Sequence, residues 1–331
     1  MRNKKLLVTG GAGYIGSHVV RQLGAAGEDV VTLDNLCTGF REAVTAGELI
    51  VGETGDAALL ERIFAEHDID TILHFAAHTI VPESVADPLK YYRNNTCSSR
   101  TLLEAAQKHG VRHFVFSSTA AVYGIPPGGK AAEDSPNVPI NPYGTSKLMT
   151  EWMLRDLAIA GGPSYVALRY FNVAGADPRG RTGQSTANAT HLIKIACEAA
   201  LGKRDGLTVF GDDYDTPDGT GVRDYIHVAD LAAAHRLAIE YLRAGGPSAA
   251  MNCGYGQGFS VLQVIDRVKA VSGVDFPVRH AGRRAGDSHE IVAASDLVRE
   301  TLGWQPAYND LDVIVGHALA WEKKLAMRNR S

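Results

Sequence analysis

A tyrosine and a lysine four residues apart, Tyr143 and Lys147, are the side chains of this sequence best suited to proton transfer. If the segment is helical, positions i and i+4 share one face, so the ammonium lies beside the phenol. A phenol titrates near pH ~10 in water and is a poor base at neutral pH. A neighbouring cation lowers that pKa and makes the tyrosine a usable proton acceptor. Because the same spacing also occurs on ordinary helix surfaces, its meaning depends on the rest of the chain.

A glycine-rich turn near the N-terminus predicts a nucleotide site. Residues 4–9 read as a short buried strand, and Gly10, Gly13 and Gly16 follow it directly. A helix is predicted over residues 17–26. Glycines at this spacing permit a tight turn, close approach of a pyrophosphate to the backbone, and close packing of the strand against the helix. The helix N-terminus then offers unpaired N–H groups and the positive end of its dipole to the phosphates.

An acidic residue after the next strand indicates which dinucleotide is bound. A second apolar strand is predicted over residues 29–33 and is followed by Asp34, 18 positions after Gly16. The ribose-binding acid of such sites is expected roughly 20 residues after the glycines. A carboxylate there accepts hydrogen bonds from ribose hydroxyls and repels a 2′-phosphate. We therefore predict NAD, and not NADP, as the cofactor.

Length and composition restrict the class of protein. The chain has 331 residues, 45% hydrophobic and 21% charged, which suffices for a large core and one or two domains. Its net charge of −4 indicates no general attraction to nucleic acid or anionic membranes. The four cysteines lack metal-like spacing, and no apolar run approaches the ~18 residues of a membrane helix. Because the first strand begins close to Met1, leaving no room for a signal peptide, we expect a cytoplasmic protein without a metal site.

Alternating strands and helices in the first half of the chain predict an α/β fold of the Rossmann type. Repeated βα units with apolar strands favour a doubly wound parallel sheet. Further strands are predicted over residues 70–75, 112–117 and 164–169, and helices over residues 57–67, 88–109 and 143–160.

After about residue 172 this pattern loosens into shorter elements. We predict an NAD-binding domain over residues 1–175, to which the chain returns near 220–245. A smaller, mixed α/β substrate-binding domain is predicted mainly over residues 176–331. Helices of this part are predicted over residues 187–201, 230–242, 262–271 and 311–326.

Eight segments carry a resemblance to a known family, and they span nearly the whole chain. They cover residues 8–18, 33–36, 74–77, 116–124, 142–147, 168–172, 219–230 and 283–287. With these segments in this order, the chain resembles the extended short-chain dehydrogenase/reductases, and within them the UDP-glucose 4-epimerase family. The segment Gly-Thr-Gly-Val-Arg-Asp-Tyr-Ile-His at 219–227 is the most specific to the epimerases.

The resemblance implies an isomerase that interconverts UDP-galactose and UDP-glucose in galactose metabolism. In such an enzyme C4 of the sugar is oxidised transiently by NAD, the 4-keto sugar rotates, and the same hydride returns to its other face. The resemblance implies Tyr143 as the base, and Lys147 as the residue that lowers its pKa and holds the nicotinamide ribose. Thr119, predicted at a strand end, would hydrogen-bond the 4-hydroxyl or relay its proton.

The resemblance also implies a set of residues around each ligand. Arginine suits the diphosphate because its planar fork binds phosphate oxygens in pairs. In addition to Tyr143 and Lys147, the NAD contacts are Gly10, Gly13, Tyr14, Ile15, Gly16, Asp34, Asn35, Asp56, Phe75, Ala76, Ala77, Asn95, Ser117 and Tyr170. The substrate contacts, besides Thr119, are Asn172, His191, Leu192, Val209, Phe210, Arg223, Tyr225, Arg284 and Asp287.

Three alternatives remain beside this reading. A sugar-nucleotide 4,6-dehydratase needs an added acid and base, usually carboxylates directly after the Ser/Thr, but Ala120 and Ala121 follow Thr119. A 4-epimerase of UDP-GlcNAc, UDP-xylose or UDP-glucuronate would use identical chemistry. A non-catalytic NAD-sensing protein would have no need of Tyr143, Lys147 and Thr119 together. The resemblance further implies a homodimer that pairs the helices near 88–109 and 143–160.

Overall fold

A seven-stranded parallel sheet forms the larger part of the computed structural model, which describes residues 4–187 and 189–328. The strand order is β11-β7-β5-β4-β1-β2-β3, and each neighbouring pair is parallel. The strand order reverses direction between β1 and β4, which is where doubly wound sheets bind their ligands. The predicted Rossmann-type fold is thus confirmed. The strands are β1 (Lys5–Thr9), β2 (Val30–Asp34), β3 (Glu48–Val51), β4 (Ile69–His74), β5 (His113–Thr119), β7 (Ser164–Tyr170) and β11 (Ala249–Cys253).

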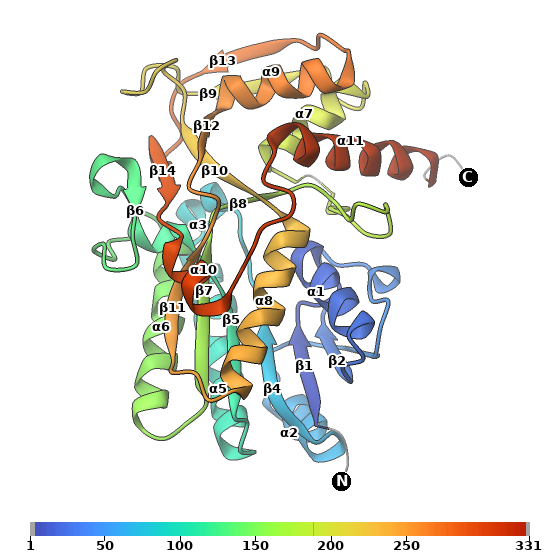
Figure 1. The fold of residues 1–331 in the computed structure, drawn as a ribbon, viewed down its shortest axis with the longest axis vertical. Coiled ribbons are helices and arrows are strands. Elements are labelled where there is room, and N and C mark those ends of the chain that lie inside the picture. The colour runs from blue at the N-terminus through green and yellow to red at the C-terminus, as the bar shows by residue number, and fades with distance from the viewer. Residues whose placement is uncertain (1–3, 188, 329–331) are drawn as a thin grey trace.

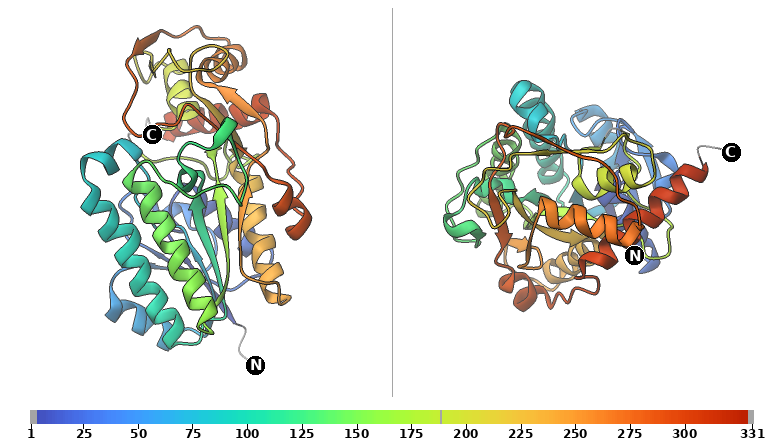
Figure 2. Two further views of the ribbon diagram at one scale, coloured as in Figure 1. Left: turned by 90° about the vertical axis from the view of Figure 1, so that its left-hand side faces the viewer. Right: turned by 90° about the horizontal axis from the view of Figure 1, so that it is seen from above.

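Helices cover both faces of this sheet because successive strand side chains point to opposite faces. Leu6 and Val8 of β1 belong to the core beneath α1 and α8, whereas Leu7 packs with α2, α5 and α6. Figure 2 shows α5 and α6 on one side of the sheet and α8 on the other. The bounds are α1 (Tyr14–Ala25), α2 (Ala57–Glu66), α5 (Ser98–Lys108), α6 (Pro142–Ile159) and α8 (Val228–Arg243).

A smaller α/β part lies beyond the carboxyl ends of these strands (Figure 1). One of its sheets has the order β12-β10-β14-β6, with β8 also paired to β10, and a second sheet pairs β13 with β9. Helices α7, α9 and α11 enclose its apolar core. The bounds are β6 (Lys130–Ala131), β8 (Asn172–Ala174), β9 (Leu207–Phe210), β10 (Val222–His227), β12 (Gly258–Ser260), β13 (Val278–Ala281), β14 (Glu290–Ala293), α7 (Leu192–Ala200), α9 (Val261–Ser272) and α11 (Leu311–Arg328).

The chain passes between the two parts more than once. After β10 it returns to the large sheet through α8 and β11, and α10 (Asp296–Leu302) packs there as well. The domain limits at residues 175 and 176 therefore stay a prediction. Some residues of the predicted domains lie outside the described residues, namely 1–3, 188 and 329–331. Residue 188 also falls within the helix predicted over 187–201.

The helix predicted over residues 88–109 forms three pieces. They are α4 (Pro88–Tyr91), a π-helical segment η2 (Tyr92–Cys97) and α5. Such π segments occur frequently at functional sites. Short elements complete the fold, namely α3 (Val81–Ala86), η1 (Arg41–Ala43), η3 (Ala120–Tyr123) and η4 (Pro127–Gly129).

Two properties of the described residues bear on the class of protein. Over residues 4–187 and 189–328, none of the helices has the length and apolar character needed to cross a membrane. In that same part of the chain, no group of His, Cys, Asp or Glu side chains could hold a metal ion.

Candidate active site

The turn between β1 and α1 is built so that only glycine fits at two of its positions. Gly10 has φ of +71°, and a Cβ atom there would lie 2.6 Å from the backbone nitrogen of Ala76. At Gly16, a Cβ atom would lie 2.2 Å from the carbonyl oxygen of Gly10. Gly13 is the N-cap of α1 and has more room, since its nearest contact would be 3.3 Å away. The turn thus exposes bare backbone at a helix N-terminus, where a phosphate is favoured.

The carboxylate of Asp34 lies beside this turn, at the end of β2. Its two oxygens accept hydrogen bonds from the backbone nitrogens of Ala12, at 2.9 Å, and Leu36, at 2.8 Å. Asn35 follows at the surface, and the exposed Asp56 caps the N-terminus of α2. The glycine turn and the acid at the neighbouring strand end together fit the pyrophosphate and ribose of NAD. The adenine contact of Asp56 stays a prediction.

The loop after β4 closes the other side of this turn. Phe75, Ala76 and Ala77 lie there half-buried, with Ala76 against Gly10. Asn95 of the π segment fixes the loop: its side-chain oxygen accepts from the His78 backbone nitrogen at 2.8 Å, and its amide donates to the His78 carbonyl at 3.0 Å. The same amide donates to Ser146 Oγ at 3.0 Å, so Asn95 joins this loop to α6.

The predicted catalytic side chains meet at the end of β5. Asn141 caps α6 by accepting from the Gly144 backbone nitrogen at 2.8 Å, and Tyr143 lies in the first turn of that helix. The Tyr143 hydroxyl is hydrogen-bonded to Thr119. One turn later, Lys147 donates from Nζ to the Ser117 carbonyl at 2.8 Å. The structure therefore brings Tyr143, Lys147 and Thr119 together.

Burial controls the protonation of both groups. Burial raises the pKa of Tyr143, and the hydrogen bond to Thr119 partly opposes that shift. For Lys147, burial lowers the pKa from 10.5 to about 7, against the opposing charge of Glu151. The sequence predicted a downward shift for Tyr143 from its lysine neighbour, but the net direction is upward. The reason is that desolvation disfavours the phenolate and that the ammonium is engaged by a backbone carbonyl.

The aromatic ring of Tyr170 completes this region. Its hydroxyl is hydrogen-bonded to Ser117 Oγ, and burial raises its pKa. Tyr14, in the first turn of α1, donates from its hydroxyl to the Gly175 carbonyl at 2.7 Å. Ile15 follows it in the same turn. These contacts place the predicted NAD residues of β5, β7 and α1 along one edge of the sheet.

The predicted diphosphate and uridine residues form a second group on the smaller part. The Arg284 guanidinium lies 4.8 Å from the centre of the Phe210 ring, and its Nε donates to Asp287 at 2.9 Å. Burial lowers the pKa of Arg223 more than any other influence does. The nearby charge of Asp287 raises that pKa, and the nearby charge of Arg284 lowers it. Val209, next to Phe210, is buried in the core. Four of the predicted residues thus lie close together.

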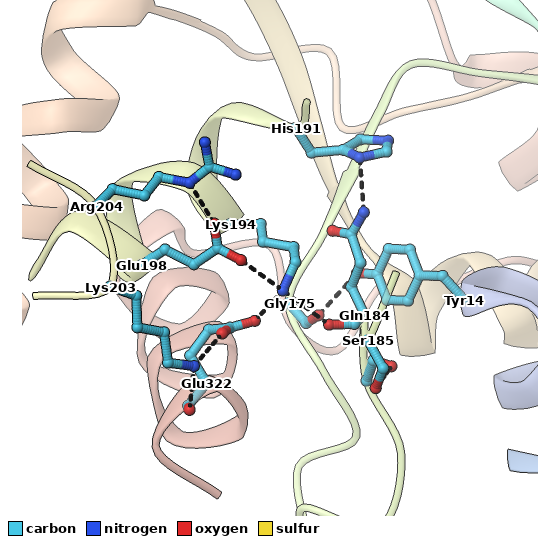
Figure 3. Close-up of polar contacts among 11 residues, drawn as sticks. Tyr14, Gly175, Gln184, Ser185, His191, Lys194, Glu198, Lys203, Arg204 and Glu322 are labelled. Carbon is cyan, nitrogen blue, oxygen red and sulfur yellow. Dashed lines mark hydrogen bonds and ion pairs between the residues drawn. The ribbon is translucent and has the colours of Figure 1, made fainter. Parts of the chain in front are cut away.

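The remaining predicted residues line a small cavity that α7 and α11 also line. Asn172 of β8 and Tyr225 of β10 are direct neighbours in the strand register, and both line it with His191 and Leu192. Gln184 Nε2 and His191 Nδ1 are 2.7 Å apart (Figure 3). The sugar and diphosphate contacts of these residues stay a prediction.

Ion pairs beside this cavity were missed from the sequence. Lys194 lines the cavity, pairs with Glu198 at 3.2 Å and also pairs with Glu322 of α11 (Figure 3). Lys203 pairs with the same Glu322 carboxylate at 2.8 Å. The spacing of Lys194 and Glu198 at i and i+4 is visible in the sequence, but the pairing with α11 is not.

A contact between the two parts of the molecule was also missed. Asn141 Nδ2 donates to the Gly286 carbonyl at 3.2 Å. The N-cap of the helix that carries Tyr143 is thus tied to the loop that carries Arg284 and Asp287.

Comparison with known proteins agrees with this geometry. The model of the NAD dependent epimerase/dehydratase family matches residues 6–254. A UDP-glucose 4-epimerase of Azospirillum brasilense is 58% identical over 322 residues, which are 97% of this chain and 92% of the relative. The structure of this chain is similar to that of a Brucella ovis UDP-glucose 4-epimerase in complex with NAD. The two are 44% identical with a TM-score of 0.92, and the match covers 96% of this chain and 98% of that one. A UDP-Glc/GlcNAc 4-epimerase of Campylobacter jejuni is 46% identical with a TM-score of 0.84, covering 97% and 100%.

The matches to the individual relatives extend over nearly the full length of the chain. The large sheet and the glycine turn agree with the cofactor named in the family. The prediction of NAD as the cofactor is thereby confirmed. The chain belongs to the NAD dependent epimerase/dehydratase family, and within it to the UDP-glucose 4-epimerases.

Proposed function

We propose that the protein interconverts UDP-galactose and UDP-glucose by inversion at C4 of the sugar. The observation that carries the proposal is the convergence of Tyr143, Lys147 and Thr119 at the end of β5. These groups lie at the edge of the sheet to which the glycine turn also belongs, so a base, a cation and a dinucleotide site face the same region. A protein that only binds NAD has no use for that combination.

The chemistry follows from the ionisation of Tyr143. NAD, when bound, supplies the acceptor and later the donor of the C4 hydride. Tyr143 accepts the proton of the 4-hydroxyl and afterwards returns it, while Thr119 orients the hydroxyl. Because burial disfavours the phenolate, we propose that the Lys147 ammonium, one turn further along α6, favours that form. General-base catalysis of this kind contributes about 10²–10⁴-fold to a rate.

Inversion requires a substrate whose nucleotide is held while its sugar turns. We propose that Arg223 and Arg284 bind the diphosphate, with Asp287 on the uridine ribose and Phe210 beside the uracil. Hydrogen bonds to charged groups are worth about 1.5–3 kcal/mol each, so the two arginines can hold the diphosphate through the rotation. Asn172 and Tyr225, which are neighbours in the strand register, would offer the sugar polar contacts that can be exchanged.

The test is to incubate the purified protein with UDP-galactose, without added NAD, and to follow the sugar by NMR. Formation of UDP-glucose is expected, and it would show both inversion at C4 and cofactor retained through purification. No conversion, even after NAD is supplied, would exclude UDP-galactose as the substrate. The same experiment with UDP-GlcNAc tests the second candidate, which is favoured by the 46% identity to the Campylobacter jejuni UDP-Glc/GlcNAc 4-epimerase.

We also propose a homodimer formed by α5 and α6. The two helices lie side by side on one face of the sheet (Figure 2), and α6 presents Trp152 and Ile159 to solvent, 46% and 80% exposed. Large apolar side chains on an outer helix face suit an interface between copies. Light scattering should give a dimer for the wild type and a smaller species for Trp152→Arg. The control is Val271→Arg at an exposed site of α9, which should stay dimeric.

A cytoplasmic location is proposed from the cysteines. All four, Cys37, Cys97, Cys197 and Cys253, are unpaired, which suits a reducing compartment. Cell fractionation followed by detection of the protein would test it, and recovery in a secreted or membrane fraction would contradict it.

A further inference from the structure

Three consecutive residues at the end of β5 are joined to three successive turns of α6. Thr119 is hydrogen-bonded to Tyr143, and the Ser117 carbonyl accepts from Lys147 Nζ at 2.8 Å. Between them, Ser118 Oγ donates to Glu151 Oε1 at 2.5 Å. Because Tyr143, Lys147 and Glu151 are spaced by four residues, they follow one another along a single face of the helix. Glu151 is therefore the third member of a row whose other members carry the proposed chemistry.

Glu151 is held in place by a buried arginine. Its carboxylate and Arg169 of β7 form a two-pronged pair, with Arg169 Nη2 at 2.6 Å from one oxygen and Nε at 3.0 Å from the other. The side chains are only 6% and 5% exposed, respectively. The two-pronged geometry fixes the carboxylate, and the loss of one partner of a buried pair leaves an uncompensated charge.

The pair is anchored to further elements. Arg169 Nη1 donates to the Tyr123 hydroxyl at 2.9 Å, and that hydroxyl donates to Asn252 Oδ1 at 2.7 Å. Asn252 in turn donates through its amide to the Ala131 carbonyl at 2.9 Å. The carboxylate of Glu151 is thus fixed to β5 and β7 directly, and to β11 through this chain of hydrogen bonds.

We propose that Glu151 is a positioning residue for the proton-transfer site, which fixes the end of β5 against α6 and provides the negative charge that faces the Lys147 ammonium. This inference rests on the proposed function of Tyr143 and Lys147. Within residues 4–187 and 189–328, Glu151 is the only carboxylate whose charge shifts the pKa of Lys147. The other groups near it are the Ser117 carbonyl, the Phe116 ring and His74, which burial keeps neutral with a pKa of about 3.

The sign of the effect follows from two opposing influences on Lys147. Burial lowers its pKa to about 7, and Glu151 opposes that shift by raising it. Removal of the Glu151 charge therefore deprotonates Lys147 at a lower pH. Tyr143, whose pKa burial raises above its ordinary value, ionises only where Lys147 is already neutral, so the loss of Glu151 should show in the titration of Lys147 and not in that of Tyr143. One pH unit of displacement corresponds to about a tenfold change in the ratio of protonated to neutral lysine.

The test is a titration of Lys147 that needs no sugar turnover. The NMR signal of the lysine side-chain Cε in the purified, isotopically labelled, NAD-bound protein is followed against pH, and the signal that is absent from Lys147→Met identifies this lysine. In Glu151→Gln we expect the midpoint to move down by about one pH unit from the wild-type value of about 7. The control is Asp70→Asn, which removes a buried carboxylate paired with Arg112 at the other end of the sheet. It should lower stability and leave the midpoint unchanged.

A midpoint in Glu151→Gln equal to that of the wild type would overturn the inference. If the single variant does not fold, the double variant Glu151→Gln/Arg169→Met carries the test, because it leaves no unpaired buried charge. The same downward displacement is expected from it, and a wild-type midpoint again overturns the inference. Failure of the proposed epimerase activity would appear separately, as the expected displacement of the Lys147 midpoint without conversion of any UDP-sugar by the wild type.

Discussion

The glycine turn allows the nucleotide site to be tested by two neighbouring substitutions with opposite expected effects. Gly16→Ala should destabilise the fold, whereas Gly13→Ala should keep the fold and weaken NAD binding. Both positions lie at the start of α1, so the two variants differ in what the added methyl group meets and in little else.

The expected magnitudes follow from the contacts. At Gly16 the methyl carbon would lie 2.2 Å from the Gly10 carbonyl oxygen and 2.8 Å from the Gly11 Cα, and backbone atoms cannot move aside easily. Overpacking costs about 1–3 kcal/mol, and contacts this short favour the upper end. Gly13 has φ of −77° and ψ of −179°, which alanine adopts freely, and its nearest contact would be 3.3 Å. The less suitable N-cap costs at most ~1 kcal/mol there.

The loss of affinity at Gly13 comes from the ligand side. A methyl group at the N-cap of α1 separates a phosphate oxygen from the backbone N–H groups of the first turn. The loss of one charge-assisted hydrogen bond costs about 1.5–3 kcal/mol, and each 1.4 kcal/mol is tenfold in affinity. We therefore expect NAD to bind at least about tenfold more weakly to Gly13→Ala.

Calorimetric NAD titration and urea unfolding of the nucleotide-free proteins measure the two effects separately. Gly16→Ala should lose about 3 kcal/mol of unfolding free energy, and Gly13→Ala no more than ~1 kcal/mol. Unchanged NAD affinity in Gly13→Ala would refute the placement of the diphosphate at this helix. Wild-type stability in Gly16→Ala would refute the contact geometry.

Three further predictions concern catalysis, cofactor choice and pH. Tyr143→Phe should lower kcat about 10²–10⁴-fold, with little change in melting temperature, as steady-state assays and calorimetry would check; more than a tenth of the wild-type rate would contradict it. Asp34→Asn should weaken NADH binding and narrow the preference over NADPH, measured by fluorescence titration; an unchanged ratio would contradict the ribose role. Burial lowers the pKa of His18 to about 4 and of His74 to about 3, so the unfolded chain binds more protons below about pH 6.5 and the free energy of unfolding should fall from pH 7 to pH 5; equal values from urea titrations would contradict it.

Much of the fold could be predicted because its signals are local. The apolar runs before Gly10 and Asp34 have the length of buried strands, and their strands β1 and β2 pair in the structure. The π segment around Asn95 has no such signal, because it differs from an α-helix only in the partners of its backbone. Strand β11 was also missed, since its place beside β7 depends on pairings with residues far away in the sequence.

The proposed catalytic pair could be predicted from its spacing together with the glycine turn and the family resemblance, but the surroundings of the pair could not. Glu151 follows Lys147 at helical spacing, yet its partner Arg169 lies on a strand and is identified only when that strand packs against α6. The upward direction of the Tyr143 pKa was likewise missed, because desolvation depends on the whole enclosure and not on one neighbour.

The central claim is that Tyr143 and its neighbours serve a transient oxidation at C4, and isotope labelling tests it most directly. UDP-galactose that carries deuterium at C4 is incubated with the protein in ordinary water, and the UDP-glucose formed is analysed by NMR and mass spectrometry. The account predicts that the deuterium remains on C4 of the product, because the same hydride leaves and returns. Replacement of the deuterium by hydrogen from the solvent would contradict it.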